Sequence, residues 1–488
     1  MKSKISPLKE YDKTNGLKFK FWSSTPNDGI WSLDGVVYNE GQDFRTCEKY
    51  AEYKAAGFNM AHLGNTVLAH QLEIGKPEPI TKEQFLEKNL KALQALNEVG
   101  FDEIDISDYR FTNILSRKVG GLIGEGKLFA TEKDLDAFIE ERVSWYRDLP
   151  GINSICIGDE PTWWGLESFG QVFKSVGRVC PDKKRFYNFF TGIDNEDATG
   201  PIIPKEGQTR FDAAKEQYAR YINTALDCMG EGVDHICFDD YPILTDHVSE
   251  TFIPVLQILA DIAKERGIAL HAWTQTFEML HFGAVHYRKV EKADAYWLNN
   301  LLLGFGVKAI GYYLYVSCNE NMTKGENYID GSSFVTRKHE KTDVYNFMQQ
   351  IMKEDQEFAP VILNFDYQGS KSFTWQYCYL DKQQIKLVDN SYEFKKLVGI
   401  DFHQGCQGCL MATELYDKNK NNYMYMVMNA LDPALNPAIT SQEFTVTFDN
   451  DYENAVVYSC GIGTEVQLVN HSLCVTLKAG EAVFIIPY

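Results

Sequence analysis

The chain has 488 residues, of which 44% are hydrophobic and 24% are charged, a composition typical of globular proteins. Its 68 acidic residues outnumber its 48 basic ones, and the resulting net charge of −20 opposes binding to nucleic acid or to anionic membrane surfaces. No stretch reaches the roughly 18 to 20 apolar residues that are needed to cross a bilayer. The length predicts two or three domains, or one barrel with an accessory domain.

The N-terminal segment and the cysteines bear on the cellular compartment. Residues 1–16 are polar and contain no apolar signal segment, and the 11 cysteines are scattered without a pattern. Such a set suits a reducing compartment, so we expect a cytoplasmic protein. Cys406 and Cys409, with His403 nearby, could form half of a metal site, but no second Cys-x-x-Cys pair completes four ligands. We therefore expect no metal and no cofactor.

Short apolar runs alternate with longer helical patterns between about residues 17 and 317, as in repeated βα units. Thr81 with Gln84, and Thr131 with Asp134, have the spacing of helix N-terminal capping boxes. No glycine-rich phosphate loop follows an early strand, which argues against a dinucleotide-binding fold. The pattern therefore predicts a (β/α)8 TIM barrel over residues 1–340. The eight expected strands begin near Leu17, Phe58, Phe101, Ile152, Arg185, Val233, Ala269 and Val307.

The pattern changes after residue 340. We expect a connecting helix over residues 341–360 and then an accessory domain over 361–488, where short runs with period-two alternation are separated by Gly, Asn and Asp turns. These runs predict an antiparallel β-sandwich. Such a domain could bind a ligand, but a structural role or a contact within a homo-oligomer is the favoured interpretation.

The run from Ile152 to Gly158 ends abruptly in two carboxylates, Asp159 and Glu160, before Pro161. In a (β/α)8 barrel, catalytic groups lie at the C-terminal ends of the strands, and side chains alternate along a strand, so one of the two carboxylates points into the barrel mouth. A glycosidase needs a proton donor with a raised pKa, which a nearby tryptophan could provide. The structural alternative is that both carboxylates pair with arginines at the rim. We expect Glu160 to be catalytic, and Asp159 and Trp163 to bind substrate.

Other predicted strand ends carry the same kinds of side chain. Strand six ends in Asp239, Asp240 and Tyr241, which makes both aspartates catalytic candidates, and Glu278 follows strand seven. Aromatic faces stack on pyranose rings, while amides and hydroxyls bind the sugar hydroxyls. The mixture predicts a carbohydrate pocket. The expected substrate-binding residues at these ends are His62, Asn65, Asn188, Tyr241, Trp273, Gln275 and Tyr313.

With Gly158-Asp159-Glu160-Pro161, Asp239-Asp240-Tyr241-Pro242 and Trp273-Thr274-Gln275, the chain resembles clan A barrel glycoside hydrolases over about residues 40–320. It is more similar still to uncharacterised bacterial glycosidase-like proteins. The resemblance implies that Glu160 is the general acid/base, with Asp159 in place of the usual asparagine. It also implies that Gln275 occupies the position of the usual glutamate nucleophile, which leaves the second catalytic carboxylate open.

Several mechanisms and functions fit these residues. If Glu278 is the nucleophile, the carboxyl separation should be about 5 to 5.5 Å and the reaction retaining; if Asp239 or Asp240 activates water, it should be about 6.5 to 9.5 Å and inverting. The predicted function is hydrolysis of a glycosidic bond in a small or oligomeric carbohydrate. The alternative is a catalytically inactive carbohydrate-binding barrel. A metal-dependent hydrolase built on His62 and Asp105 is disfavoured, because no His-x-His ends strand one.

Overall fold

The computed structural model describes residues 5–11, 16–33, 36–39, 41–63, 81–101, 103–108, 119–282, 285–317, 333–378, 383–405, 408–435 and 440–488. Asn65 and Cys406, which entered the predictions, lie outside the described residues. None of the helices within these ranges is long and apolar enough to span a membrane.

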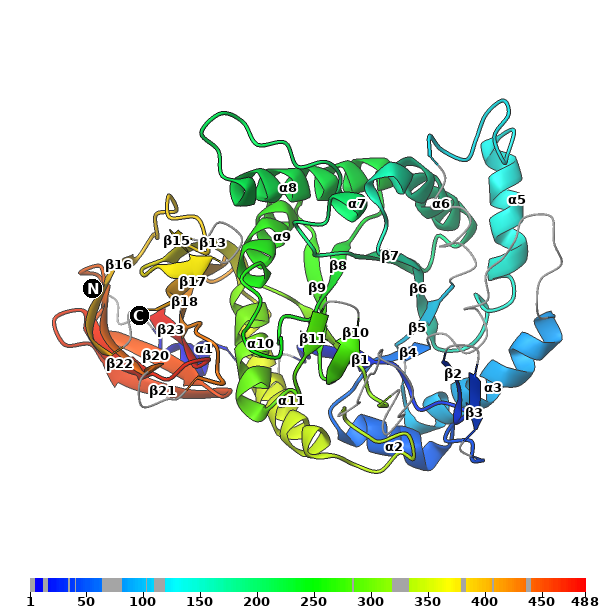
Figure 1. The fold of residues 1–488 in the computed structure, drawn as a ribbon. Helices are drawn as coiled ribbons and strands as arrows, with labels where there is room; N and C mark the ends of the chain where they lie inside the picture. Colours follow the sequence, from blue (N-terminus) through cyan, green and yellow to red (C-terminus); the bar gives the residue numbers. More distant parts are fainter. Residues whose placement is uncertain are drawn as a thin grey trace.

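Eight parallel strands form one sheet, in the order β1-β12-β9-β8-β7-β6-β5-β4. A bridge between Ser24 and His62, just beyond β1 and on β4, joins the two ends of that order and closes the ring. The ring lies inside a circle of helices (Figure 1). The predicted TIM barrel is therefore confirmed. The strands are β1 (Lys20–Ser23), β4 (Ala61–Leu63), β5 (Ile104–Ser107), β6 (Ile152–Asp159), β7 (Lys184–Phe189), β8 (His235–Asp240), β9 (Ala269–Gln275) and β12 (Ala309–Tyr313).

A helix follows each of these strands and packs on the outside of the ring (Figure 1). Thr81 and Thr131 form the capping boxes that their spacing predicts, and Gly100, with a φ of 86°, ends its helix in the left-handed conformation that favours glycine. The outer helices are α2 (Cys47–Ala55), α3 (Lys82–Val99), α5 (Glu132–Val143), α6 (Leu166–Val179), α8 (Arg210–Met229), α9 (Phe252–Arg266), α10 (Lys292–Gly304) and α11 (Asp343–Ile362). Shorter elements are α1 (Pro7–Glu10), α7 (Glu196–Thr199), η1 (Trp163–Gly165) and the hairpins β2 (Ile30–Leu33) with β3 (Val36–Asn39) and β10 (Met279–Phe282) with β11 (Val285–Tyr287).

One apolar layer crosses the middle of the barrel. Six strands each contribute one buried side chain to it, because residues two apart on a strand share a face. On each strand, the residue two positions before the layer residue lies toward the N-terminal end of the strand, and the residue two positions after it lies toward the C-terminal end. The apolar layer thus separates two polar ends of the barrel interior. It consists of Trp22, Cys156, Phe186, Cys237, Trp273 and Ala309, with Met60 packed against it.

The C-terminal part is a β-sandwich, as predicted. Two antiparallel sheets enclose a separate apolar core that includes Leu397, Tyr425, Phe444 and Ile485. The larger sheet has the order β13 (Asp366–Ser372), β17 (Leu410–Asp417), β18 (Asn422–Asn429), β23 (Ala482–Pro487), β20 (Asn454–Ser459) and β21 (Ile462–Gln467). The smaller sheet has the order β16 (Leu397–Gly405), β19 (Gln442–Phe448) and β22 (Ser472–Leu477), and β14 (Gln376–Cys378) pairs with β15 (Gln383–Ile385).

The sandwich lies against the barrel helices α9, α10 and α11 (Figure 1). Buried Trp297 of α10 donates a hydrogen bond from its indole Nε1 to the carbonyl oxygen of Ala430, at 3.0 Å. The N-terminal segment reaches the same domain, because the Tyr11 hydroxyl donates to Oδ2 of Asp417 at 2.9 Å. The barrel and the sandwich therefore share a packed interface.

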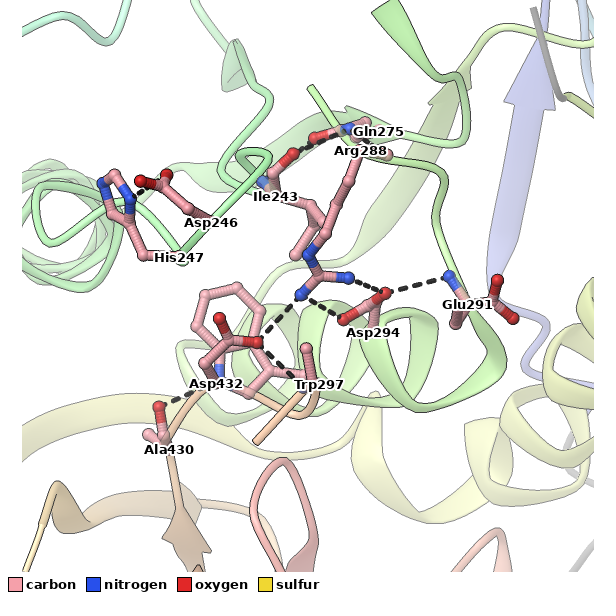
Figure 2. A network of polar contacts seen from close by, with 11 residues as sticks. Ile243, Asp246, His247, Gln275, Arg288, Glu291, Asp294, Trp297, Ala430 and Asp432 are labelled. Carbon is pink, nitrogen blue, oxygen red and sulfur yellow. Dashed lines mark hydrogen bonds and ion pairs between the residues drawn. The ribbon is translucent and has the colours of Figure 1, made fainter. Parts of the chain in front are cut away.

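Arg288 lies at the centre of a buried ion network at this interface (Figure 2). Its guanidinium donates to both carboxylate oxygens of Asp294, one of them at 2.9 Å, and to Oδ1 of Asp432 at 2.8 Å. The Asp294 side chain is 1% exposed and that of Asp432 is 11% exposed. One cation thus neutralises a carboxylate at the start of α10 and a second carboxylate from the accessory domain.

We expect Arg288→Ala to lower the free energy of unfolding by about 3–5 kcal/mol, because it leaves two buried carboxylates without their cation. Urea unfolding of the full chain measures the loss. Arg210→Ala is the matched control: Arg210 pairs with Glu196 at 2.7 Å, but its side chain is 59% exposed, so the loss should stay below about 1 kcal/mol. Equal losses in the two variants would contradict the proposed role of burial.

Candidate functional site at the C-terminal end of the barrel

Asp159 and Glu160 end β6 in different environments. A bulge between Cys156 and Gly158 shifts the register, so that Asp159 pairs with Asn188 of β7, whose Nδ2 donates to Oδ1 of Asp159 at 2.9 Å. Glu160 adopts a φ of 45°, in the left-handed region, and its backbone N–H donates to the carbonyl oxygen of Asn188 at 2.8 Å. Asp159 is consequently partly buried, whereas Glu160 is exposed at the rim.

Asp239 lies on the interior face of β8, two residues beyond Cys237 of the apolar layer. Its Oδ1 is buried and has no hydrogen-bond partner among the described residues. Burial raises the pKa of Asp239 well above its ordinary value, and the negative charges of Asp159 and Glu160 raise it further. A hydrogen bond with Tyr241 acts in the opposite direction. Asp239 is therefore within electrostatic reach of both strand-four carboxylates.

Asp159 also has a raised pKa, mainly because of burial. The hydrogen bond from Asn188 and the positive charge of His62 partly offset this rise. Like charges at close range favour states in which one carboxyl keeps a proton. Asp159 and Asp239 therefore form a carboxyl pair that holds a proton to higher pH than ordinary aspartates do.

Asp240 is the next residue of β8 after Asp239, so its side chain points to the opposite face of the strand. Burial raises its pKa to about 7, although hydrogen bonds from Thr191 and from the Tyr241 backbone lower it. The Thr191 hydroxyl also donates to the carbonyl oxygen of Asp239, at 2.7 Å. Asp240 is thus a partly buried carboxyl on the other face of the strand, and its charge still acts on Asp239.

Aromatic side chains surround the carboxyl pair at two levels. Trp273, in the apolar layer, is 9% exposed and makes an edge contact with His62, with ring centroids 5.2 Å apart. At the rim, Tyr313 is 40% exposed and its ring lies 5.6 Å from that of Tyr241, while Trp163 of η1 is 43% exposed. The upper rings offer apolar faces to solvent at the same end of the barrel as Glu160.

His62 lies between the site and the barrel interior. Its Nε2 is 2.8 Å from the Ser107 hydroxyl, and its Nδ1 is 3.9 Å from Oδ2 of buried Asp105. The effect of His62 on the pKa of Asp159 places it near the predicted acid site. Asn65 lies outside the described residues.

Gln275 is 1% exposed, and its amide is engaged by backbone groups (Figure 2). Its Nε2 donates to the carbonyl oxygens of Ile243 at 3.2 Å, Phe277 at 3.1 Å and Arg288 at 3.4 Å. Its Oε1 accepts from the backbone N–H of Ile243 at 3.0 Å. The amide thus ties the loop after β8, which carries Tyr241, to the segment after β9. Glu278 follows in that segment and is partly buried.

Two residues of the site were missed by sequence reasoning. Tyr287 of β11 faces the acidic end: burial raises its pKa to about 12, with further contributions from the charges of Asp240, Asp239 and Glu160. Tyr221 of α8 donates a hydrogen bond from its hydroxyl to the carbonyl oxygen of Pro161 and so holds the turn after Glu160. Tyr287 lies in a hairpin and Tyr221 in an ordinary amphipathic helix, so neither carries a strand-end signal.

Among the described residues there is no group of three or more His, Cys, Asp or Glu side chains placed to hold a metal ion. Of the two cysteines of the predicted half-site, Cys409 is buried and Cys406 lies outside the described ranges.

No known family model matches the chain, and no curated protein matches it. Among solved structures, xylanase 10B from Thermotoga maritima is 14% identical with a TM-score of 0.40, covering 72% of this chain and 99% of that protein. An alpha-amylase from Anoxybacillus is 10% identical with a TM-score of 0.48, covering 96% and 97%. A glycoside hydrolase family 5 protein from Bacteroides vulgatus is 11% identical with a TM-score of 0.49, covering 96% and 88%.

The raised pKa of Asp240 predicts a pH dependence of stability. The folded chain holds this proton up to about pH 7, whereas an ordinary aspartate releases it near 3.8, so the folded state binds more protons in between and its stability falls as pH rises through this window. In Asp240→Asn, the decrease in the free energy of unfolding between about pH 4 and pH 7 should be smaller than in wild type by about 1–3 kcal/mol, allowing for screening at a partly exposed group.

Urea unfolding at a series of pH values measures the difference between the two proteins. Asp148→Asn, at a side chain that is 87% exposed, is the control for the loss of one carboxylate. A fall of the same size in wild type and Asp240→Asn would show that Asp240 is ionised throughout the window.

Proposed function

We propose that this protein hydrolyses a glycosidic bond in a small or oligomeric carbohydrate. The observation that carries the proposal is the electrostatic coupling of exposed Glu160 to partly buried Asp239, whose pKa is raised. Glycoside hydrolysis needs one carboxyl that holds a proton and a second that is ionised, on either side of the scissile bond. The raised pKa of Asp239 keeps a proton at this end of the barrel, and the charge of Glu160 acts on it, so a protonated and an ionised carboxyl can coexist here.

We assign the general acid/base role to Glu160. Its side chain is exposed at the rim, where a substrate would enter, and its backbone is held from both sides by the Asn188 carbonyl and by the turn that Tyr221 binds. We assign the second carboxyl to Asp239 rather than to Glu278, because Asp239 is acted on by the charges of both Asp159 and Glu160. In this role the proton that Asp239 holds would move to Glu160 when substrate binds, which leaves Asp239 ionised. Asp240 and Glu278 become the next candidates if Asp239→Asn keeps its turnover.

The substrate-binding roles follow from the exposed and polar groups of this end. We propose that Trp163 and Tyr313 stack on sugar rings, since both present exposed aromatic faces. His62, Asp159, Asn188 and Tyr241 would bind hydroxyl groups, and Trp273 would form the floor; Asn65 stays a prediction. Gln275, with its amide engaged by backbone groups, would hold the two loops in position instead of touching sugar.

One observation favours a second function, a carbohydrate-binding barrel without catalysis. Gln275 stands where the clan A resemblance places the nucleophile, and it is neutral, buried and committed to backbone hydrogen bonds. Such a protein would keep the aromatic rim and bind sugar without turnover.

Glu160→Gln should reduce turnover of glycosides with poor leaving groups by roughly 100-fold or more, because general acid catalysis is lost. It should leave turnover of dinitrophenyl glycosides, whose leaving group needs no proton, much less affected. Asp239→Asn should reduce turnover of both substrate classes. Steady-state kinetics on a panel of α- and β-linked aryl glycosides and oligosaccharides measures the three proteins.

Glu231→Gln is the control, because Glu231 is exposed in the loop before β8, at the opposite end of the same strand from Asp239. Unchanged kinetics in Glu160→Gln would refute its assigned role. If the wild type shows no turnover but binds oligosaccharides, and Trp163→Ala weakens that binding, the protein is a carbohydrate-binding protein and not an enzyme.

A further inference from the structure

A second cavity lies at the N-terminal end of the barrel, on the other side of the apolar layer from Glu160. Its volume is about 100 Å³. Its polar lining includes Lys20, Glu103, Asp105, Ser154, Lys184 and His271. Most of them stand at or near the first residues of their strands, so this cavity lies at the other end of the barrel from Glu160, and His62 lies between its deep end and the candidate active site.

The deep end of the cavity contains polar atoms without partners. Asp105 is 1% exposed, and neither of its carboxylate oxygens has a hydrogen-bond partner among the described residues. The nearest basic atom is Nδ1 of His62, at 3.9 Å, beyond hydrogen-bond distance. The Ser154 hydroxyl is likewise buried and unpaired within the described chain. A buried carboxylate is costly unless donors reach it, so this end of the cavity favours a ligand with several N–H groups.

Aromatic and imidazole rings line the same cavity as Asp105. Trp22 and Phe186 of the apolar layer line the cavity, together with His235 and His271, whose rings stack 4.0 Å apart. Aromatic faces attract cations, especially where water is excluded. A carboxylate beside aromatic rings is a favourable environment for an ammonium group.

The mouth of the cavity has the opposite charge. Lys184, exposed at the first residue of β7, and Lys20, which pairs with Glu103, both line it. Burial lowers the pKa of His271 well below its ordinary value, and the positive charges of His235, Lys20 and Lys184 lower it further. Glu103 offsets Lys20, and Lys184, whose charge also acts on Asp234 outside the lining, is the second cation at the mouth, so this mouth favours an anionic group over a further cation.

We propose that this cavity binds a small zwitterion of the amino acid class, with its ammonium group at Asp105 and its carboxylate at Lys184. The volume matches about three water molecules, which restricts the ligand to a few heavy atoms. The cavity is lined by two positively charged side chains, Lys20 and Lys184, and two negatively charged ones, Glu103 and Asp105. A ligand with no net charge therefore suits it. The site does not depend on the proposed glycosidase activity.

Thermal unfolding and isothermal calorimetry of the full chain test the proposal with glycine, β-alanine and γ-aminobutyrate as probes. Propylamine, which carries only the positive charge, and propionate, which carries only the negative charge, are the single-charge probes. We expect saturable binding of at least one zwitterion and weaker binding of both single-charge probes. Asp105→Asn should weaken the zwitterion about tenfold or more, because it removes a charge-assisted contact.

Lys184→Met should also weaken binding, and it tests the proposal even if Asp105→Asn fails to fold, since Lys184 is exposed. Lys183→Met is the matched control, because the neighbouring ammonium pairs with Asp182 at 3.2 Å and does not line the cavity. No binding of any zwitterion, equal binding of the single-charge probes, or unchanged affinity in Lys184→Met would overturn the proposal. Glu160→Gln should bind the zwitterion as wild type does, so loss of catalysis and loss of this site are distinguishable.

Discussion

Side-chain alternation along a closed ring of parallel strands determines what each end of this barrel contains. On β7, β8 and β9 the interior face carries Lys184-Phe186-Asn188, His235-Cys237-Asp239 and His271-Trp273-Gln275. Each strand thus contributes a basic or imidazole group, an apolar group and then an amide or carboxyl group. The register is staggered, since Asn188 pairs with Cys237, and Cys237 and Asp239 pair with His271 and Trp273. The same order of polar, apolar and polar groups therefore recurs along each strand, at positions that are offset from one strand to the next.

The acidic end needs support because its carboxyl groups repel one another. Asn188 donates to Asp159, Tyr221 holds the turn after Glu160, and Gln275 fastens the loop that follows Asp239. The backbone carbonyl of Arg288 accepts from Gln275, while its guanidinium binds Asp432 of the accessory domain. The sandwich is therefore connected to the acidic end through two residues, although it lies outside the ring of helices.

The fold could be predicted from sequence because buried parallel strands are short apolar runs, and the eight observed strands begin within three residues of the expected positions. In the sandwich, β19 alternates buried and partly buried residues and β18 and β23 are continuous apolar runs, whereas β13 is a polar, serine- and glycine-containing run that gives no such signal. The carboxylates at the strand ends could also be recognised in the sequence, because each pair directly follows an apolar run. The bulge in β6, the engagement of the Gln275 amide and the approach of Tyr287 depend on tertiary contacts, so the sequence pattern could not distinguish Asp159 from Glu160 as the interior group.

Arg288 and Asp432 make the accessory domain part of the barrel's own electrostatic balance. A domain attached only by a linker can be exchanged for another by recombination at the boundary. Here an unrelated domain without a carboxylate at this point would leave a buried guanidinium with one counter-ion fewer, and a barrel without Arg288 would leave the sandwich with an unmatched charge. The two halves of the chain are therefore constrained to change together in evolution, and substitutions at positions 288, 294 and 432 should be inherited as a set.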